Sequence, residues 1–580
     1  MKLDDVMERL SSFKEDTPKR IGGNVEHFTH ESYDVEKNRL LDSGNLESAN
    51  SLMNGELILK EFNPVRVDEP DWGIDPFSDR NWLWRYHQLE FIRDLLKAYE
   101  QSSDSKFLEE SWRWINSWID ANYLDEPKSV MAWHDHATAL RLQHLILFHQ
   151  VAGEWLTDDI TPQFEFVLAN HCRLLADPNF YSFSKNTNHG FDQMLILLVS
   201  ANVLFGLEEA NEWSELASAR LVNEIQFAFS GGGIHVENSP AYHQLMMIGI
   251  IRARNTLKSL SVEVVLDFDK MLSKGVEFLA WITQPDGRIP TIGDSVSVPT
   301  LASLDNLINC HSSEYLRYVC SGGEIGSPPL NEHFFFLDDG WAVFRSQFSK
   351  GCDFKTSIQL IMKSAFFSNY HRHDDDTSIT LHAFGRRWFI DTGMYNYHEK
   401  EKERMFVRSV LGHNMMILNG VKINRNSEEA GKNTKMWQSD NGGKKVYAST
   451  DIFEGYRLQR SVEKVSEMVY RITDSYSLLD GSSELDDVFV QFHFPFDIQA
   501  SVKDDFVELS DIDGNIIQLI MNHPVSRISF HSGINDGVIE SWNSTQYGVG
   551  EDSQVIRFHL PNNQLESIID INLIRGENDG

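Results

Sequence analysis

The hydrophobic residues of this 580-residue chain change their spacing once along the sequence, and that change constrains the fold most. Between about residue 81 and residue 260 they recur every three to four positions, which predicts amphipathic helices. Beyond about residue 335 they alternate in short runs rich in β-forming residues, which predicts strands. The two patterns meet at a loop rich in proline and glycine, Pro285 to Asp294. We therefore expect a helical domain followed by a large antiparallel β domain.

The predicted helices are amphipathic and follow one another with short polar connections. Each apolar stripe needs a partner face, so helical hairpins stacked side by side are expected. The stripes lie at Phe91–Tyr99, Trp112–Trp118, Leu140–Phe148, Leu195–Val203 and Leu245–Leu257, with shorter helical pieces at Val6–Phe13 and Asp34–Leu41.

The predicted strands are short and spread over the last 245 or so residues. They are Trp341–Arg345, Ser357–Met362, Ser378–Phe384, Arg387–Ile390, Met415–Leu418, Met468–Ile472, Val488–His493, Ile516–Met521 and Val555–Phe558. Between the third and fourth of these, Phe384-Gly385-Arg386-Arg387 predicts a type II′ turn with Gly385 at its first central position.

Composition excludes several classes of function. The formal charge of −34, from 52 basic and 86 acidic residues, argues against nucleic acid as a partner. No apolar run approaches the roughly 18 residues of a membrane helix, so no membrane partner is expected. Cys172, Cys310, Cys320 and Cys352 contain no closely spaced pair and are predicted to be free thiols. The first ten residues carry acids where a secretory signal would be apolar, which predicts a cytoplasmic protein, or a periplasmic or secreted one whose leader was removed.

The segment Asn369 to Ser378 concentrates chemically active side chains, with two imidazoles, a guanidinium and three carboxylates. In an extended backbone, residues two apart point to the same side. His371 and His373 are therefore predicted to face one cleft, while Arg372 points away. That arrangement suits a proton-transferring imidazole beside a metal-binding one; the alternative is an acidic surface loop with solvated histidines.

Four stretches in a fixed order carry a family resemblance. They are Thr187-Asn188-His189-Gly190, Glu237 to His243, Ile292-Gly293-Asp294, and the His371 segment with its continuation to Gly412-His413-Asn414. Together they resemble the heparinase II/III family of polysaccharide lyases, and Asn81-Trp82 and Trp133 to Arg141 extend the resemblance over about residues 80 to 420.

The resemblance implies a multidomain α+β fold, with an incomplete (α/α) toroid followed by an antiparallel β-sandwich domain and the active site between them. We expect a mixed helical extension over residues 1–60, the toroid over 61–330 and the β-sandwich over 331–580. The length of the chain alone suggests three or four domains, but large toroids and sandwiches form domains longer than average, so fewer domains are expected.

The implied activity is β-elimination in a uronic-acid-containing, glycosaminoglycan-like polysaccharide, which leaves a 4,5-unsaturated uronate end. The resemblance gives Asn188 the task of neutralising the uronate carboxylate, with His189 assisting it or acting as a base. Tyr242 and His371 match the catalytic pair: one removes the C5 proton and the other protonates the leaving oxygen, in either order. Alternatives are an Asn188 that caps a helix and a Tyr242 that is packed between helices.

The resemblance also implies one divalent metal ion, expected to be zinc with a mainly structural role. By position its ligands are His373, Asp391 and His413, a set that suits zinc. A simple hairpin leaves His373 roughly 23 Å along the strand from Asp391. The segment Asp374 to Thr377 must therefore bend back, and the alternative is a His413 that only forms a hydrogen bond.

Substrate binding requires cations and hydrogen-bond donors, because a guanidinium binds a carboxylate or sulfate bidentately. The expected partner is an acidic polysaccharide or oligosaccharide, and the oligomeric state is left open. The candidates are Trp82, His87, His134, His136, Arg141, Glu237, Arg372, Arg404 and Arg408, each of which has an ordinary packed or exposed residue as its alternative.

Two other functions fit parts of the pattern. A glycoside hydrolase on a helical toroid would need two carboxylates, roughly 6.5 to 9.5 Å apart in inverting enzymes, and Glu237 with Asp294 could supply them. The Asn, Tyr and His set would then have no purpose. A polysaccharide-binding protein of a biosynthesis system would keep the fold without turnover.

Overall fold

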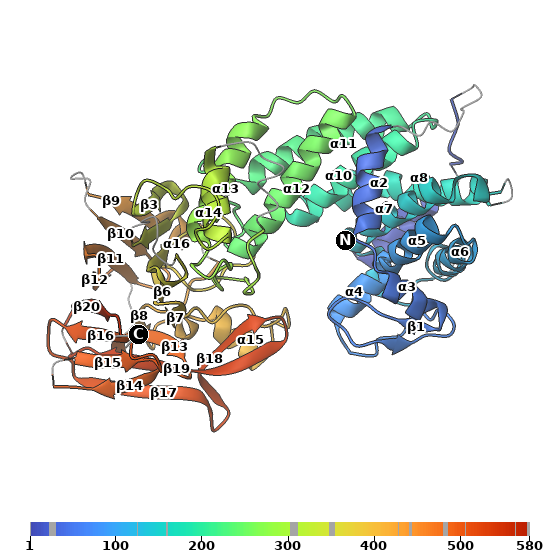
Figure 1. Cartoon of the computed structure of the whole chain (residues 1–580). Helices are drawn as coiled ribbons and strands as arrows, with labels where there is room; N and C mark the ends of the chain where they lie inside the picture. The colour runs from blue at the N-terminus through green and yellow to red at the C-terminus, as the bar shows by residue number, and fades with distance from the viewer. Residues whose placement is uncertain are drawn as a thin grey trace. The chain divides into compact units, whose positions relative to one another are not determined.

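The computed structural model describes residues 2–14, 16–21, 31–124, 126–157, 160–301, 311–346, 354–426, 428–439, 444–479, 485–504, 506–562 and 564–576. The chain forms two compact units. Unit 1 comprises residues 1–228 and 249–266, and unit 2 comprises residues 229–248 and 267–580. Figure 1 shows the helices and strands of both units along the chain.

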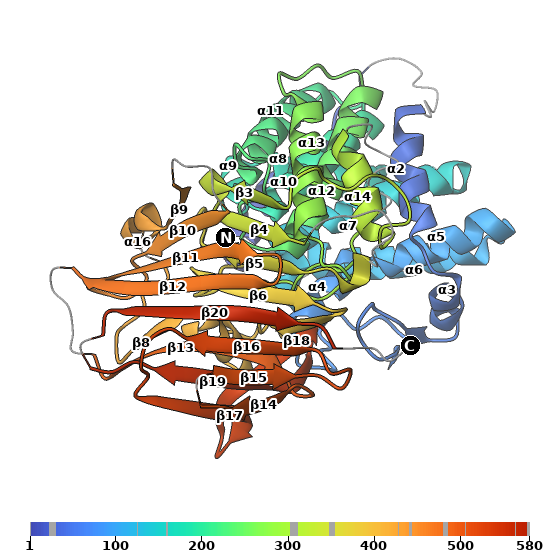
Figure 2. The ribbon, with the colours of Figure 1, turned by 60° about the vertical axis from the view of Figure 1, so that its left-hand side comes forward.

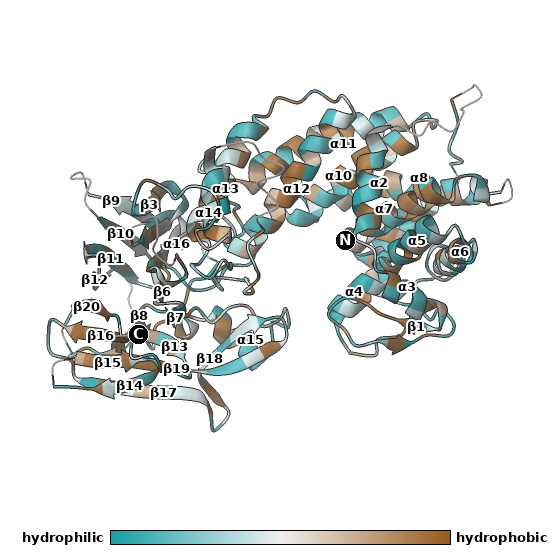
Figure 3. Ribbon diagram, in the orientation of Figure 1, coloured by the Kyte–Doolittle hydropathy of each residue, from teal (hydrophilic) through white to brown (hydrophobic). Residues whose placement is uncertain are grey.

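Unit 1 is helical, as the spacing predicts. Phe91, Ile92, Leu95 and Leu96 are each at most 2% exposed, so the predicted stripe packs inward, and the helices carry both hydrophobic and hydrophilic stretches (Figure 3). Its helices are α1 (Leu3–Phe13), α2 (Glu31–Asp42), α3 (Leu46–Met53), α4 (Arg80–Gln88), α5 (Phe91–Ser102), α6 (Lys106–Ile119), α7 (Asp135–Ala152), α8 (Thr161–Ala176), α9 (Pro178–Ser182), α10 (Asn188–Val203), α11 (Ala210–Ala228) and the second half of α12 (Pro240–Ser259). Short pieces are β1 (Glu56–Leu57), β2 (Val65–Arg66), η1 (Asp120–Leu124), η2 (Val130–Trp133) and η3 (Gly153–Trp155).

Unit 2 begins with helical segments and continues as antiparallel sheets. Its helical segments are the first half of α12, α13 (Phe268–Ile282), α14 (His311–Cys320), η5 (Leu337–Asp339), η6 (Phe354–Thr356), α15 (Lys402–Arg408), η7 (Val410–Gly412) and α16 (Glu428–Asn433).

The strands of unit 2 form three antiparallel sheets. The first has the order β3 (His333–Phe336), β4 (Trp341–Arg345), β5 (Gln359–Lys363), β6 (Ser378–Ala383), β7 (Arg386–Phe389). The second has the order β17 (Arg527–Asn535), β18 (Val538–Gln546), β19 (Val549–His559), β13 (Asp487–Pro495), β8 (Met416–Asn419). The third has the order β14 (Gln499–Val502), β15 (Phe506–Ser510), β16 (Ile516–Met521), β20 (Glu566–Ile574), β12 (Val469–Leu478), β11 (Tyr456–Ser466), β10 (Lys445–Thr450), β9 (Lys435–Gln438), and Figure 2 shows several of these strands side by side.

All three sheets contribute to one hydrophobic core. Phe344, Trp388, Phe492 and Ile571 belong to it and are completely buried. The predicted order, helices first and an antiparallel β-sandwich second, is therefore confirmed, and all nine predicted strands lie on or overlap strands of the structure. The boundaries at residues 60 and 330 stay predictions.

The hairpin between β6 and β7 turns one residue earlier than predicted. Ala383 pairs with Arg386, so the two-residue loop is Phe384-Gly385, with φ values of 55° and 82°. Two positive φ values are characteristic of a type I′ turn, whose twist matches that of the strands. Gly385 therefore occupies the second central position, and the type II′ prediction was wrong.

Two further expectations from the sequence concern the cysteines and membrane-spanning helices. Cys172 and Cys320 are free thiols as predicted, whereas Cys310 and Cys352 lie outside the described residues. Among the helices that the structure describes, none is both long and apolar enough to cross a membrane.

Candidate active site

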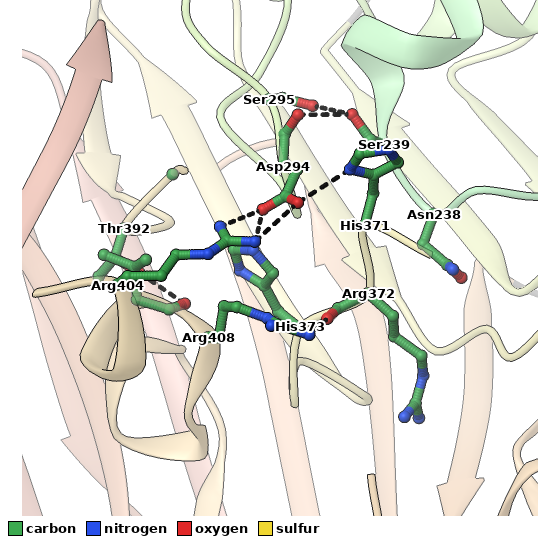
Figure 4. Close-up of polar contacts among 12 residues, drawn as sticks. Asn238, Ser239, Asp294, Ser295, His371, Arg372, His373, Thr392, Arg404 and Arg408 are labelled. Carbon is green, nitrogen blue, oxygen red and sulfur yellow. Dashed lines mark hydrogen bonds and ion pairs between the residues drawn. The ribbon is translucent and has the colours of Figure 1, made fainter. Parts of the chain in front are cut away.

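Three segments of unit 2 are joined at the start of α12. The Ser239 hydroxyl lies 3.0 Å from the Asp294 carbonyl oxygen and 2.8 Å from the Ser295 hydroxyl. The Ala241 amide donates to Ser295 Oγ at 3.2 Å, and the Asp294 amide donates to the His371 carbonyl oxygen at 3.4 Å. These bonds hold the Asp294 loop and the His371 loop against the helix end, as Figure 4 shows.

The backbone at this junction has an unusual conformation. Asn238, Gly293 and His371 have φ values of 61°, 59° and 53°, in the left-handed region. A Cβ atom at Gly293 would lie 2.7 Å from the Asn238 carbonyl oxygen, so only glycine fits there. The Asn238 side chain compensates for its own strain by donating to the carbonyl oxygens of Ser368 and Tyr370 at 3.0 Å each.

Asp294 is the centre of the site, although it is only 2% exposed. Its oxygens lie 2.9 Å from His371 Nδ1 and 2.7 Å from His373 Nε2, and Arg404 binds both oxygens at 2.5 and 2.9 Å. Burial acts to raise the pKa of Asp294, but the hydrogen bonds from the two histidines and Arg404 outweigh it and hold the pKa well below its usual value. Asp294 is therefore an ionised carboxylate.

Tyr242 and His371 lie face to face. Their ring centroids are 3.7 Å apart, the planes are inclined by 20°, and the Tyr242 hydroxyl contacts the Tyr397 hydroxyl at 2.6 Å. Burial, then Tyr397 and the charges of Asp294 and Glu237, raise the pKa of Tyr242 well above its usual value. The phenol therefore keeps its proton at neutral pH.

The imidazole of His371 has a defined environment on both nitrogens. Nδ1 faces the carboxylate of Asp294, while Nε2 lies 3.5 Å from Glu237 Oε2. A carboxylate that accepts the Nδ1 proton selects the tautomer with a free Nε2 lone pair. The site thus combines a protonated phenol with an imidazole nitrogen able to accept a proton.

The side chains of the His371 segment point in the predicted directions, while the roles given to His371 and His373 stay predictions. His371 and His373 bind the same carboxylate, whereas Arg372 points away from it (Figure 4). Because His371 has a positive φ, the geometry results from a turn and not from the extended backbone that was expected.

The candidate arginines are engaged by protein groups. Arg372 is 2% exposed, binds Asp376 at 2.6 Å and donates to the Arg425 carbonyl oxygen. Arg404 is also 2% exposed and holds Asp294. Arg408 pairs with Glu399, which Arg404 also contacts at 3.3 Å. Arg372 and Arg404 therefore support the loops around His371 by binding protein carboxylates, and their predicted contacts with substrate stay predictions.

His373, Asp391 and His413 could hold a metal ion. One ligand atom from each lies within 4.8 Å of the others, and all three residues are buried. His373 Nδ1 and His413 Nε2 have no hydrogen-bond partner among the described residues, while their other nitrogens bind Asp294 and Asp391. Carboxylates that fix histidine tautomers in this way are typical of metal sites. The required bend occurs at Thr377, whose φ is 71°.

Asn188 and His189 open helix α10 in unit 1. The Thr187 hydroxyl caps the helix by accepting from the amides of His189 and Gly190, so Asn188 is not the cap. His189 Nδ1 lies 3.1 Å from Asp135 Oδ2, and its ring stacks on His136 with centroids 4.1 Å apart.

The neighbouring histidines are also paired. His136 contacts Asp192 at 2.9 Å, and His134 contacts Asp135 at 3.0 Å. The side chain of His189 is 34% exposed and that of His136 only 8%, so His189 is the more accessible of the stacked pair.

Three candidate substrate-binding residues lie in the helical core of unit 1. Trp82 is 1% exposed and stacks on Tyr86, and His87 is completely buried against Trp118. Arg141 is completely buried, lies 3.8 Å from the centre of the Trp118 ring and donates to the His87 carbonyl oxygen. These three residues contribute to packing. An ordinary packed residue was the alternative to a substrate-binding role for each of them.

Sequence reasoning missed the importance of three residues. Asp294 was noted only as the end of a motif and as a carboxylate for the alternative hydrolase, and Tyr397 and Glu399 were not singled out. The available signal was local: Asp294 ends a loop rich in glycine and proline, and Tyr397 and Glu399 precede Arg404 in a polar run with three carboxylates.

Comparisons with known proteins agree on one family. Residues 20–317 match the heparinase II/III N-terminus model, and residues 328–572 match the heparinase II/III-like C-terminal model. Among curated proteins, no sequence matches this chain.

Solved structures show the same fold. A heparinase III structure has 17% identity and a TM-score of 0.72, over 99% of this chain and 92% of its own. The heparan sulfate lyase HepC from Pedobacter heparinus has 16% identity and a TM-score of 0.65, over 99% and 88%. A chondroitin AC lyase from Streptomyces coelicolor A3 has 11% identity and a TM-score of 0.56, over 98% and 82%.

These matches confirm the expected toroid and β-sandwich domains, and the two family models together span nearly the whole sequence. The chain belongs to the heparinase II/III family of polysaccharide lyases, which are carbon–oxygen lyases.

Proposed function

We propose that this protein cleaves a uronic-acid-containing polysaccharide of the glycosaminoglycan class by β-elimination. The bond between C4 and its glycosidic oxygen breaks, the C5 proton leaves, and a 4,5-unsaturated uronate end remains. The single observation that supports this most is the Tyr242–His371 stack, which pairs a phenol that keeps its proton with an imidazole held by Asp294.

In the proposed mechanism His371 Nε2 accepts the C5 proton and the Tyr242 hydroxyl protonates the leaving oxygen. The ionised Asp294 orients the His371 ring and stabilises the imidazolium that forms. The Tyr397 hydroxyl holds the phenol in place at 2.6 Å. Positioned proton transfer of this kind contributes about 10²- to 10⁴-fold to a rate.

The carboxylate of the uronate must be neutralised before C5 becomes acidic enough. The roles that the resemblance gives to Asn188 and His189 stay predictions here, and they meet this requirement because an amide and an imidazole both donate hydrogen bonds. His134, the other partly exposed histidine beside Asp135, is proposed as a further contact to the polymer.

Hydrolysis is the less suitable chemistry for this site. A hydrolase needs one carboxylic acid with a raised pKa to protonate the glycosidic oxygen. Asp294 has the opposite property, because three cationic or hydrogen-bonding side chains keep it ionised. Glu237 would then be the only carboxyl group of the proposed pair that could act as the acid, whereas a hydrolase uses two.

We assign His373, Asp391 and His413 to one structural zinc ion. When bound, zinc would fix the His373 loop and so the position of the neighbouring His371; two imidazoles and a carboxylate with water suit its tetrahedral preference. Because His373 also contacts Asp294, the metal-binding loop and the catalytic imidazole share one anchor.

Incubation with a panel of uronic-acid polymers tests the proposal. Elimination produces the ultraviolet absorbance of a 4,5-unsaturated uronate in step with new reducing ends. New reducing ends without this chromophore would indicate hydrolysis. Binding without either product would indicate a protein that handles the polymer without cleaving it, and both results would overturn the proposal.

A further inference from the structure

A row of four polar residues crosses the sheet of strands β3 to β7. Arg345 pairs with Gln359, Gln359 with His382, and His382 with Arg387, each directly opposite the next on neighbouring strands. Paired residues of neighbouring strands point to the same face of a sheet. The row is therefore a continuous polar strip on one face.

The first half of the row binds the end of a helix. Arg345 donates to the carbonyl oxygens of Trp281 at 2.8 Å and of Thr283, and Gln359 Nε2 donates to the same two at 2.8 and 3.1 Å. The last carbonyl groups of a helix have no partner within it, so the two side chains satisfy the end of α13.

The second half of the row lacks such partners. His382 is 1% exposed, and its ring nitrogens form no well-aligned hydrogen bond with a described residue, although the Ser357 backbone interacts with the ring. Arg387 Nη1 is also buried without a hydrogen-bond partner, and no ion pair joins this guanidinium to a carboxylate in the described part of the chain. A buried polar group without a partner is unfavourable, so these groups are available to bind a polar ligand.

A cavity of about 470 Å³ lies at this end of the row. His382 and Arg387 line it together with Asn543, which is 5% exposed. Its exposed edge carries the carboxylates of Asp286, Asp497, Glu551 and Asp552 and the ring of Phe496, which is 63% exposed. None of these residues belongs to the Tyr242–His371 site.

The lining selects the chemistry of the ligand. A guanidinium without a carboxylate partner binds one carboxylate bidentately. Arg386 also lines the cavity and pairs with Asp497. The other acidic groups at the edge repel a polyanion, yet they accept hydrogen bonds from hydroxyl groups, and the exposed Phe496 ring offers an apolar face. Burial and the charges of Arg387 and Arg345 lower the pKa of His382 to about 3, so this ring is neutral and supplies one donor and one acceptor.

We infer that this cavity binds a singly charged sugar acid, with the ligand carboxylate on Arg387 and its hydroxyl groups on His382 and the acidic edge. A uronic acid at the end of a short oligosaccharide has this chemistry. The inference extends the proposed function, since it supplies a second binding place for the same class of sugar, but it does not depend on turnover.

Binding of D-glucuronate, measured by calorimetry and by ligand-observed NMR, tests the inference. We expect the wild-type protein to bind glucuronate and Arg387→Ala to lose this site, with at least about tenfold weaker binding, because a charge-assisted pair is removed. Glucose, which lacks the carboxylate, should bind at least tenfold more weakly than glucuronate, by the same reasoning. Arg471→Ala is the matched control, since Arg471 lies on β12 and pairs with Asp570.

The outcome separates this inference from the proposed function. Arg387→Ala should leave the rate of ultraviolet product formation from a long polymer unchanged, and its melting temperature should match that of Arg471→Ala. If Arg387→Ala binds glucuronate as tightly and with as many sites as the wild-type protein, or if the wild-type protein binds none, the inference is overturned. Either result can be obtained whether or not the protein proves to be a lyase.

Discussion

Unit 1 and unit 2 each hold an imidazole by the same device, but with different carboxylates. In unit 1, His189 contacts Asp135 and stacks on the ring of His136. In unit 2, His371 contacts Asp294 and stacks on the ring of Tyr242. In both cases Nδ1 faces the carboxylate, which orients the ring, and Nε2 of His371 lies 3.5 Å from Glu237 Oε2.

The carboxylates differ in what balances their charge. The Asp294 side chain is 2% exposed and is bound bidentately by Arg404, whereas that of Asp135 is 18% exposed and, among the described residues, forms ion pairs only with histidines. A buried carboxylate needs a permanent cation, and a carboxylate near solvent does not. Asp294 therefore has a permanently charged partner in Arg404 in addition to its two histidines.

The largest expected effect follows from removing the charge of Asp294. Asp294→Asn leaves the guanidinium of Arg404 buried without its carboxylate, so we expect a loss of about 3–5 kcal/mol in the free energy of unfolding. Urea denaturation followed by circular dichroism measures this loss.

Asp135→Asn is the matched variant in unit 1. Because its carboxylate is partly exposed and is bound to no arginine of the described residues, the expected loss is about 1 kcal/mol or less. Equal losses for the two variants would contradict the difference drawn between the carboxylates.

The two imidazoles themselves give the next largest contrast. His371→Ala removes the proposed base, so the rate of product formation should fall by about 10²- to 10⁴-fold. His189→Ala removes an assisting hydrogen bond, and about a tenfold loss is expected. Initial rates on one polymer, with far-ultraviolet circular dichroism as the check on folding, compare them; a larger loss for His189→Ala would reverse the assigned roles.

Metal removal should have a smaller effect. If His373, Asp391 and His413 hold zinc, elemental analysis should find one ion per chain, and chelation should lower the thermal midpoint by about 5 °C, because a ligand of the native state is lost. Asp391→Asn should no longer retain the ion, whereas Asp135→Asn should retain it. A metal-free protein with an unchanged midpoint on addition of zinc would refute the assignment.

Periodicity predicts much of this fold because it depends on which faces are buried. The stripe of α5, the continuous apolar run of β4 and the β-rich run of β16 are local signals, and the structure places these elements where they were expected. The turn at Phe384-Gly385 was displaced by one residue because a glycine suits either central position of a tight hairpin, and strand pairing decides between them.

The candidate site could be predicted in part. The spacing of His371 and His373 predicted that they share a target, although a turn at His371 produces this geometry, and the metal-binding set was predicted from the family resemblance. The role of Asp294 depends on contacts with residues 77, 79 and 110 positions away, which no local pattern encodes. Likewise Arg141 and Arg404 look alike in sequence as cations, and only packing shows that both are buried.

The most direct test of the account is the rate at which Tyr242→Phe forms the 4,5-unsaturated product. The account predicts that this variant folds like the wild-type protein, still binds the polymer, and forms the ultraviolet chromophore about 10²- to 10⁴-fold more slowly, because the phenol proton is absent. A folded Tyr242→Phe protein with most of the wild-type rate would contradict it.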